Sequence, residues 1–212
     1  YSRDLRMSDT LVEAPKMFRE MDGVRLENVR IPNAQETLWY CRNVDLKNVR
    51  ADRADYLFLH GENIRIEDYV QNGNYSFQYC RNVTIRDAEI HSKDAFWNSE
   101  DVTVYDSVLD GEYLGWHSKR LKLVNCRISG TQPLCYAQDL VMENCTMDDD
   151  CDLAFEYSTL RADIKGCVRS VKNPRSGSIT AGGYGEIILD AHVKAPADCE
   201  IRVGGERNCF SA

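Results

Sequence analysis

Side chains that could bind a substrate recur at a fixed interval through the middle of the chain. They are Tyr79, Asn98, His117 and Tyr136, each 19 residues after the one before. Histidine can exchange a proton near neutral pH, and an aromatic ring can stack on the apolar face of a sugar. We therefore take His117 as a candidate acid/base catalyst and the other three as candidate substrate-binding residues. An exposed ladder of side chains without function is the alternative interpretation of this column.

Carboxylates accompany the column. Asp94 and Glu112 lie four or five residues before the column position of their own segment, and Lys93 precedes Asp94 directly. Two neighbouring carboxylates can divide acid and base roles or bind a divalent cation. We predict that Asp94 or Glu112 acts with His117 in catalysis, and that Lys93 and Glu156 contact the substrate. Solvated turns are also rich in acidic residues, which is the structural alternative.

The other acidic residues, histidines and cysteines show no metal-site signature. Residues 148–152 carry four aspartates without the spacing of an EF-hand, so a solvated turn is favoured over a calcium site. His60, His91 and His192 have no partners at metal-binding spacing, and His60 is expected to point into the core. The nine cysteines include no CxxC pair, which favours buried thiols over a zinc site or a disulfide framework. We predict no metal and no cofactor.

A repeated phrase must position all these residues. It reads apolar, any residue, apolar, any residue, Asn or Asp, and its copies start at Leu5, Val24, Val44, Ile64, Val83, Val102, Leu121 and Leu140. Such alternation is typical of a β-strand with one buried face, and a short strand can bury that face only by stacking on its neighbours. The spacing of 19 or 20 residues predicts an all-β fold: a right-handed parallel β-helix solenoid of about eight coils with irregular C-terminal closing strands.

A second short strand is expected before each phrase, as at residues 38–41, 57–60 and 77–80. Period-two alternation in this strand places the His117 column on the outside of the solenoid. Towards the N-terminus, the same column is expected to continue through Leu59.

The Asn or Asp that ends each phrase forms a further column, from Asp9 to Asn144. These side chains can hydrogen-bond from coil to coil, and both residue types suit the turn that leaves a strand. The next column is mostly small or apolar and should face inward. Cys126 and Cys145 belong to it, so we expect them to be neighbouring core thiols.

The chain is predicted to form a single β-helix domain over residues 1–212, with regular coils at 1–158 and an irregular C-terminal cap at 159–212. Its first residues fall in mid-coil, so N-terminal coils are expected to be missing. The uncapped edge that results is a candidate surface for a homo-oligomer.

The composition of the chain argues against some classes of binding partner. The net charge is −8 and the pI about 5.1, which argues against nucleic acid as a ligand, and no apolar stretch is long enough to cross a membrane. The absence of a secretory signal and the expected free thiols favour a cytoplasmic location, with a secreted protein as the alternative.

The repeated V-x-L-x-N phrases resemble those of the pectate-lyase-like β-helix superfamily. Segments 92–98, 111–117 and 130–136 are similar to a bacterial family of unknown function within it. The superfamily resemblance implies polysaccharide lyases and glycoside hydrolases, although their catalytic motifs have no match here.

We therefore predict a carbohydrate-active protein of hydrolase or lyase type, with a neutral oligosaccharide as partner. The alternative is a noncatalytic scaffold that binds a glycan or a protein, and the sequence leaves open whether the chain is an enzyme. Convergence of Asp94, Asn98, Glu112 and His117 within hydrogen-bond reach would favour the enzyme. A spread along a flat face would favour binding.

Overall fold

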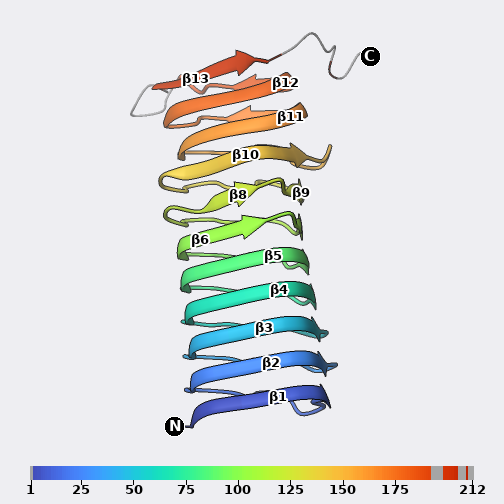
Figure 1. Cartoon of the computed structure of the whole chain (residues 1–212). Helices are drawn as coiled ribbons and strands as arrows, with labels where there is room; N and C mark the ends of the chain where they lie inside the picture. The colour runs from blue at the N-terminus through green and yellow to red at the C-terminus, as the bar shows by residue number, and fades with distance from the viewer. Residues whose placement is uncertain (1, 192–197, 205–208, 210–212) are drawn as a thin grey trace.

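The computed structural model describes residues 2–191, 198–204 and 209. Over these residues the chain is all β, and its 13 strands lie in one parallel sheet that winds into a β-solenoid of about ten turns (Figure 1). The predicted parallel β-helix is confirmed, and the predicted right-handed winding and eight regular coils agree with it. Within the described ranges there is no helix long and apolar enough to span a membrane.

Most coils contribute one long strand. The first five are β1 (Arg3–Leu11), β2 (Asp22–Ile31), β3 (Arg42–Ala51), β4 (Glu62–Asn72) and β5 (Arg81–His91). In the next two coils the strand is split, into β6 (Glu100–Tyr105) with β7 (Val108–Asp110) and into β8 (Lys122–Val124) with β9 (Arg127–Ser129). The last strands are β10 (Leu140–Met147), β11 (Thr159–Lys172), β12 (Ser176–Ile188) and β13 (Asp198–Val203).

The repeated phrases pair in register from coil to coil. Val24 pairs with Val44, and Val44 pairs with Ile64. The regular interval ends after β10: Thr159 pairs with Ser176, 17 residues on, and Ser176 pairs with Asp198, 22 residues on. The closing strands therefore continue the stack at irregular intervals.

The Asn/Asp column forms hydrogen-bonded ladders. Asn28 Nδ2 donates to Asp9 Oδ1 at 2.9 Å, and Asn48 Nδ2 donates to Asn28 Oδ1 at 2.8 Å. All eight residues have φ between 49° and 59°, a left-handed conformation that Asn and Asp adopt more readily than other non-glycine residues. The ladder stops at Asp68 because an ionised carboxylate has no hydrogen to donate. It restarts where Asn125 donates to Asp106 at 2.8 Å.

Inward columns form a continuous core. The column that contains Cys126 and Cys145 is buried as expected, and both residues are free thiols. Six cysteines in all are buried free thiols and Cys199 is a partly buried one, whereas Cys167 on β11 forms a disulfide with Cys209. The expectation of thiols is therefore correct for the regular coils and wrong for this pair. Cys209 lies beyond the last copy of the repeat, so no repeat position could identify its partner.

The predicted second strand is wrong. In each coil this segment has left-handed φ at every other residue, such as 64° at Tyr75, 58° at Phe77 and 57° at Tyr79. The middle one of these residues points inward, and its ring stacks on the neighbouring coils: Phe77 lies 4.9 Å from Phe58 and 5.2 Å from Phe96. A left-handed non-glycine residue costs about 1–2 kcal/mol, and burial of the ring offsets this cost. We call this part of each coil the left-handed segment.

One register prediction also fails. His60, expected in the core, is exposed and takes the outward place assigned to Leu59. Its ring stacks between Tyr40 at 5.0 Å and Tyr79 at 4.8 Å, and Gly61 takes the inward place. The error arises because this coil has 20 residues rather than 19.

Extending the first ladder by one rung is expected to stabilise the fold. In an Asp68→Asn variant the new amide can donate to Asn48 Oδ1 while keeping the left-handed backbone, which should raise the free energy of unfolding by about 0.5–1 kcal/mol. Urea unfolding measures this change. Asp149→Asn, at an exposed position outside the ladder, controls for the removal of one negative charge. Equal effects of the two substitutions would contradict the ladder explanation.

Candidate functional site

The predicted column lies on the surface, in the left-handed segments. We call it the aromatic stripe: Tyr40, His60, Tyr79, Asn98, His117, Tyr136 and Tyr157. His117 stacks on Tyr136 with ring centroids 4.8 Å apart, and Tyr136 contacts Tyr157 at 5.7 Å. Asn98 is the rung without a ring, so it separates two stacked groups.

Asp94 lies in a second outward column four residues earlier in each coil. Tyr56, Tyr75, Asp94 and Tyr113 occupy equivalent positions there, all with left-handed φ. Tyr56 and Tyr75 stack at 4.7 Å. We call this set the tyrosine column, and Asp94 interrupts it.

Asp94 is the unusual residue of this column. It is only 7% exposed, and in the part of the chain that the structure describes its carboxylate accepts no hydrogen bond. Loss of solvent around the carboxylate raises the pKa of Asp94, the nearby Lys93 ammonium lowers it, and the Glu112 carboxylate raises it further. The Asp94 oxygens still reach solvent, because no buried side-chain oxygen of the described residues lacks a hydrogen-bond partner. A partly desolvated charged acceptor gains from any group that donates a hydrogen bond to it.

Trp116 joins the two columns. The centroid of its ring lies 5.0 Å from that of Tyr113 and 5.2 Å from that of Tyr136. Trp97, one coil earlier, lies 5.6 Å from Trp116 and 5.5 Å from His117. The stripe and the tyrosine column therefore form one aromatic surface.

A single coil interrupts this surface in both columns. Asp94 and Asn98 belong to the same left-handed segment, with Trp97 beside Asn98. In the coil before, Tyr75 and Tyr79 occupy the equivalent positions. We call residues 93–98 the polar coil.

The structure does not assemble the predicted acid–base group. The contacts of the His117 ring among the described residues are with aromatic rings, those of Trp97, Trp116 and Tyr136. Glu112 instead pairs with Lys93, whose Nζ lies 3.4 Å from Glu112 Oε2. The same ammonium lies 5.0 Å from the centre of the Tyr113 ring. Among the described residues, no hydrogen bond joins any two of the side chains of Asp94, Asn98, Glu112 and His117.

Glu156 lies beyond the C-terminal end of the predicted site. Its carboxylate is 3.0 Å from Lys172 Nζ, and its backbone oxygen accepts from the Tyr136 N–H. Burial raises the pKa of Tyr136, and the Glu156 carboxylate raises it further. Glu156 is thus held by an ion pair three coils away from the polar coil.

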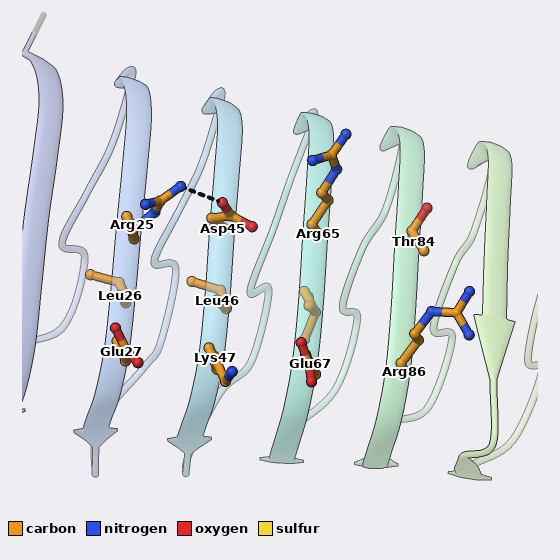
Figure 2. A pocket seen from close by; sticks show the side chains of 11 residues that line it. Arg25, Leu26, Glu27, Asp45, Leu46, Lys47, Arg65, Glu67, Thr84 and Arg86 are labelled. Atoms are coloured by element: carbon orange, nitrogen blue, oxygen red, sulfur yellow. Dashed lines mark hydrogen bonds and ion pairs between the residues drawn. The ribbon is translucent and has the colours of Figure 1, made fainter.

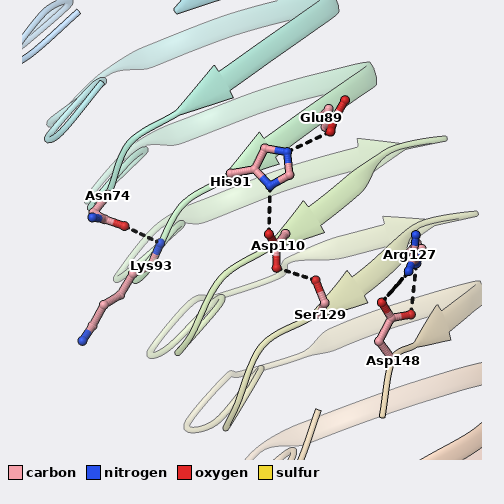
Figure 3. A network of polar contacts seen from close by, with 8 residues as sticks. All are labelled: Asn74, Glu89, His91, Lys93, Asp110, Arg127, Ser129 and Asp148. Atoms are coloured by element: carbon pink, nitrogen blue, oxygen red, sulfur yellow. Dashed lines mark hydrogen bonds and ion pairs between the residues drawn. The ribbon is translucent and has the colours of Figure 1, made fainter. Parts of the chain in front are cut away.

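No metal centre is found in the described ranges, where no three His, Cys, Asp or Glu side chains are arranged to hold an ion. In the acidic run, Asp148 makes a bidentate pair with Arg127 (Figure 3). His192 lies outside the described residues.

A polar network around His91 was missed at the sequence level (Figure 3). Its Nδ1 lies 2.8 Å from Asp110 Oδ2 and its Nε2 lies 2.8 Å from Glu89 Oε1. Ser129 Oγ donates to the other oxygen of Asp110 at 2.6 Å. His91, Asp110 and Ser129 are each 19 residues apart, so the repeat interval, applied to histidine, could have found this network.

The network changes the pKa values of His91 and Asp110. The hydrogen bond to Asp110 raises the pKa of His91, and the bond to Glu89 adds to the rise, while partial burial opposes it. Hydrogen bonds from Ser129 and then His91 lower the pKa of Asp110.

A groove of about 340 Å³ lies elsewhere, on the outward face of β2–β5 (Figure 2). Acidic and basic residues alternate along it from strand to strand, and Arg25 pairs with Asp45 at 3.0 Å. Cross-strand charge pairs of this kind stabilise a sheet. We interpret this groove as the space between two ladders of charge.

The fold and the site define an all-parallel β-solenoid with an aromatic surface along its left-handed segments. The chain belongs to the family described as protein of unknown function (DUF3737), whose model matches residues 1–202. Neither the curated proteins nor the solved structures include a significant match to it.

Protonated His91 is expected to stabilise the fold. Its pKa in the folded protein lies above the ordinary 6.5. The contribution should therefore be complete below about pH 6.5 and lost as the pH rises through the folded-state pKa. Because the side chain is about one-third exposed, we expect about 0.5–1 kcal/mol.

Urea unfolding of the native protein and of His91→Gln, at about pH 6 and about pH 9, measures this term. The difference in unfolding free energy between the two proteins should be larger at the lower pH. A difference that does not change with pH would show that the network contributes no charge-dependent stability.

Proposed function

We propose that this protein is a noncatalytic glycan-binding solenoid that holds a neutral saccharide over the polar coil. The observation that carries the proposal is the Asp94 carboxylate, which lies within a column of tyrosines, is largely shielded from solvent and accepts no hydrogen bond from the described residues. A ligand that brings hydroxyl groups supplies the missing donors. Hydrogen bonds to a charged acceptor are about twice as strong as those between neutral groups.

The ring geometry supports the same place. A ring with a stacked neighbour on both sides leaves only its edge for a ligand, whereas a ring at the end of a stacked group keeps one face without a ring partner. Tyr75 is stacked by Tyr56 on one side, and Tyr79 is stacked by His60 on one side. Their opposite faces are directed towards the polar coil, which has no ring in either column. Apolar sugar faces pack on such ring faces.

The polar coil also supplies neutral and charged hydrogen-bonding groups. Asn98 is exposed and can both donate and accept. Lys93 and Glu112, paired with each other, border the site on the Asp94 side. A neutral glycan suits the net charge of −8 better than an anionic one. The resemblance to pectate-lyase-like β-helices supports a saccharide polymer as ligand.

Binding without turnover follows from the partners that the ionisable groups have. A glycoside hydrolase needs two carboxyl groups set on either side of the bond that is cleaved. Here Asp94 is flanked by tyrosine positions, Glu112 is neutralised by Lys93, and His117 contacts aromatic rings. The protein should therefore release no reducing ends from the glycans that it binds.

Asp94→Asn tests the proposal without disturbing the backbone, because Asn also accepts left-handed φ. A panel of neutral oligosaccharides would first identify a ligand, and calorimetry would then compare the variants. Loss of the charged acceptor should weaken binding about 10- to 100-fold. Asp149→Asn is the matched control and should bind as the native protein does.

Tyr79→Ala tests the aromatic part of the site and should weaken binding about tenfold or less, as expected for loss of one stacking ring. Tyr105→Ala is its control, since Tyr105 lies on the sheet face beneath Arg86. Failure to bind any neutral glycan, or native affinity in the Asp94→Asn protein, would refute the proposed site. Turnover of a bound glycan would refute the noncatalytic assignment.

A further inference from the structure

We infer that His91 is a positioning residue: its charged imidazole ties the polar coil to the following coil and makes glycan binding stronger at acidic pH. This inference rests on the proposed function. It concerns a side chain that belongs to neither the aromatic stripe nor the tyrosine column.

The geometry at His91 requires a cation. Both ring nitrogens lie 2.8 Å from carboxylate oxygens, one of Asp110 and one of Glu89. A carboxylate can only accept, so both nitrogens must donate, which only imidazolium can do. Neutral imidazole would direct a lone pair at one of the two carboxylates and lose that contact.

Charged and polar groups surround this imidazole from each neighbouring element. Glu89 lies on its own strand β5, and Asp110 ends β7 in the next coil. From β9, Ser129 and Arg127 act on Asp110 and so hold it ionised. On the preceding coil the residue paired with His91 is the uncharged Asn72. The two carboxylates therefore dominate the charge that His91 experiences.

The His91–Asp110 bond begins a series of contacts that leads to the polar coil. The Ser92 N–H donates to Asp110 O at 2.8 Å, and the Asp94 N–H donates to Glu112 O at 2.8 Å. Between these bonds, Lys93 pairs with Glu112. Side-chain and backbone contacts thus join residues 91–94 to residues 110–112 along their whole length.

Gly111 makes this junction tight. A Cβ at this position would lie 2.2 Å from Ser92 O, so the two backbones pack with no space for a side chain. A change at His91 therefore cannot be absorbed by slack between the coils. Loosening the first contact of the series shifts the position of Lys93 and Asp94 relative to Glu112.

The predicted consequence is a pH-dependent affinity. Below the His91 pKa both contacts are made and the polar coil is held. As the pH rises from about 6 to about 9, the dissociation constant should increase about three- to tenfold, the equivalent of one hydrogen bond. His91→Gln should bind with the weaker, alkaline affinity throughout and lose this part of the pH profile.

The test combines calorimetry with NMR titration on the full chain. The imidazole resonance that disappears in His91→Gln gives the pKa of His91 without any ligand. The midpoint of the affinity change in the native protein should coincide with this pKa. Asp110→Asn should flatten the profile in the same way, whereas Asp148→Asn, which removes only the partner of Arg127, should keep it.

The outcomes separate the two proposals. If the native protein binds a neutral glycan but its pH profile is the same in His91→Gln, the role of His91 is refuted and the glycan site stands. If no neutral glycan binds, the proposed function fails, and with it any effect of His91 on binding. An ordinary pKa for His91 in the folded protein would refute the inference independently of any ligand.

Discussion

Every feature of this molecule depends on one constraint: each coil lies directly on the one before, so equivalent residues become neighbours about 4.8 Å apart. At this distance like groups can satisfy one another. Asn amides donate to the Asn or Asp one coil earlier, and phenylalanine rings stack inside while tyrosine and histidine rings stack outside. The His91–Asp110–Ser129 network is the same constraint acting on unlike side chains.

The chemistry of the side chains decides where each column of contacts begins and ends. An Asn ladder starts on Asp9 or Asp106, because a carboxylate accepts but cannot donate. On the sheet face, charges alternate along a column from Arg42 to Glu62 to Arg81. Individual exposed ion pairs add little stability. Their alternation instead opposes a shift by one coil, which would bring like charges together.

The regular strands could be predicted because their two periods, two residues along the strand and 19 or 20 between strands, agree throughout. The left-handed segments could not. Tyr75, Phe77 and Tyr79 have side chains that favour extended backbone, and only stacking on neighbouring coils stabilises their φ of 57–64°. Local sequence thus indicates a strand where the tertiary structure imposes a different backbone. The His117 column was nevertheless placed on the surface correctly. His60 was misplaced because its coil is one residue longer.

The candidate site could be located from the sequence but its chemistry could not. His117 was proposed as an acid/base catalyst because it is a histidine, yet in the structure its ring stacks on aromatic rings. Asp94 was found as a flanking acid, and only the structure shows that it lies buried in a column of tyrosines. A repeat fold is stable when each coil carries what its neighbours carry, so another tyrosine would stabilise the column more than a partly desolvated carboxylate. Replacing a ring by a polar group in both outward columns of one coil lowers stability at that coil, and this departure is why we place the binding site there rather than along the uniform remainder of the stripe.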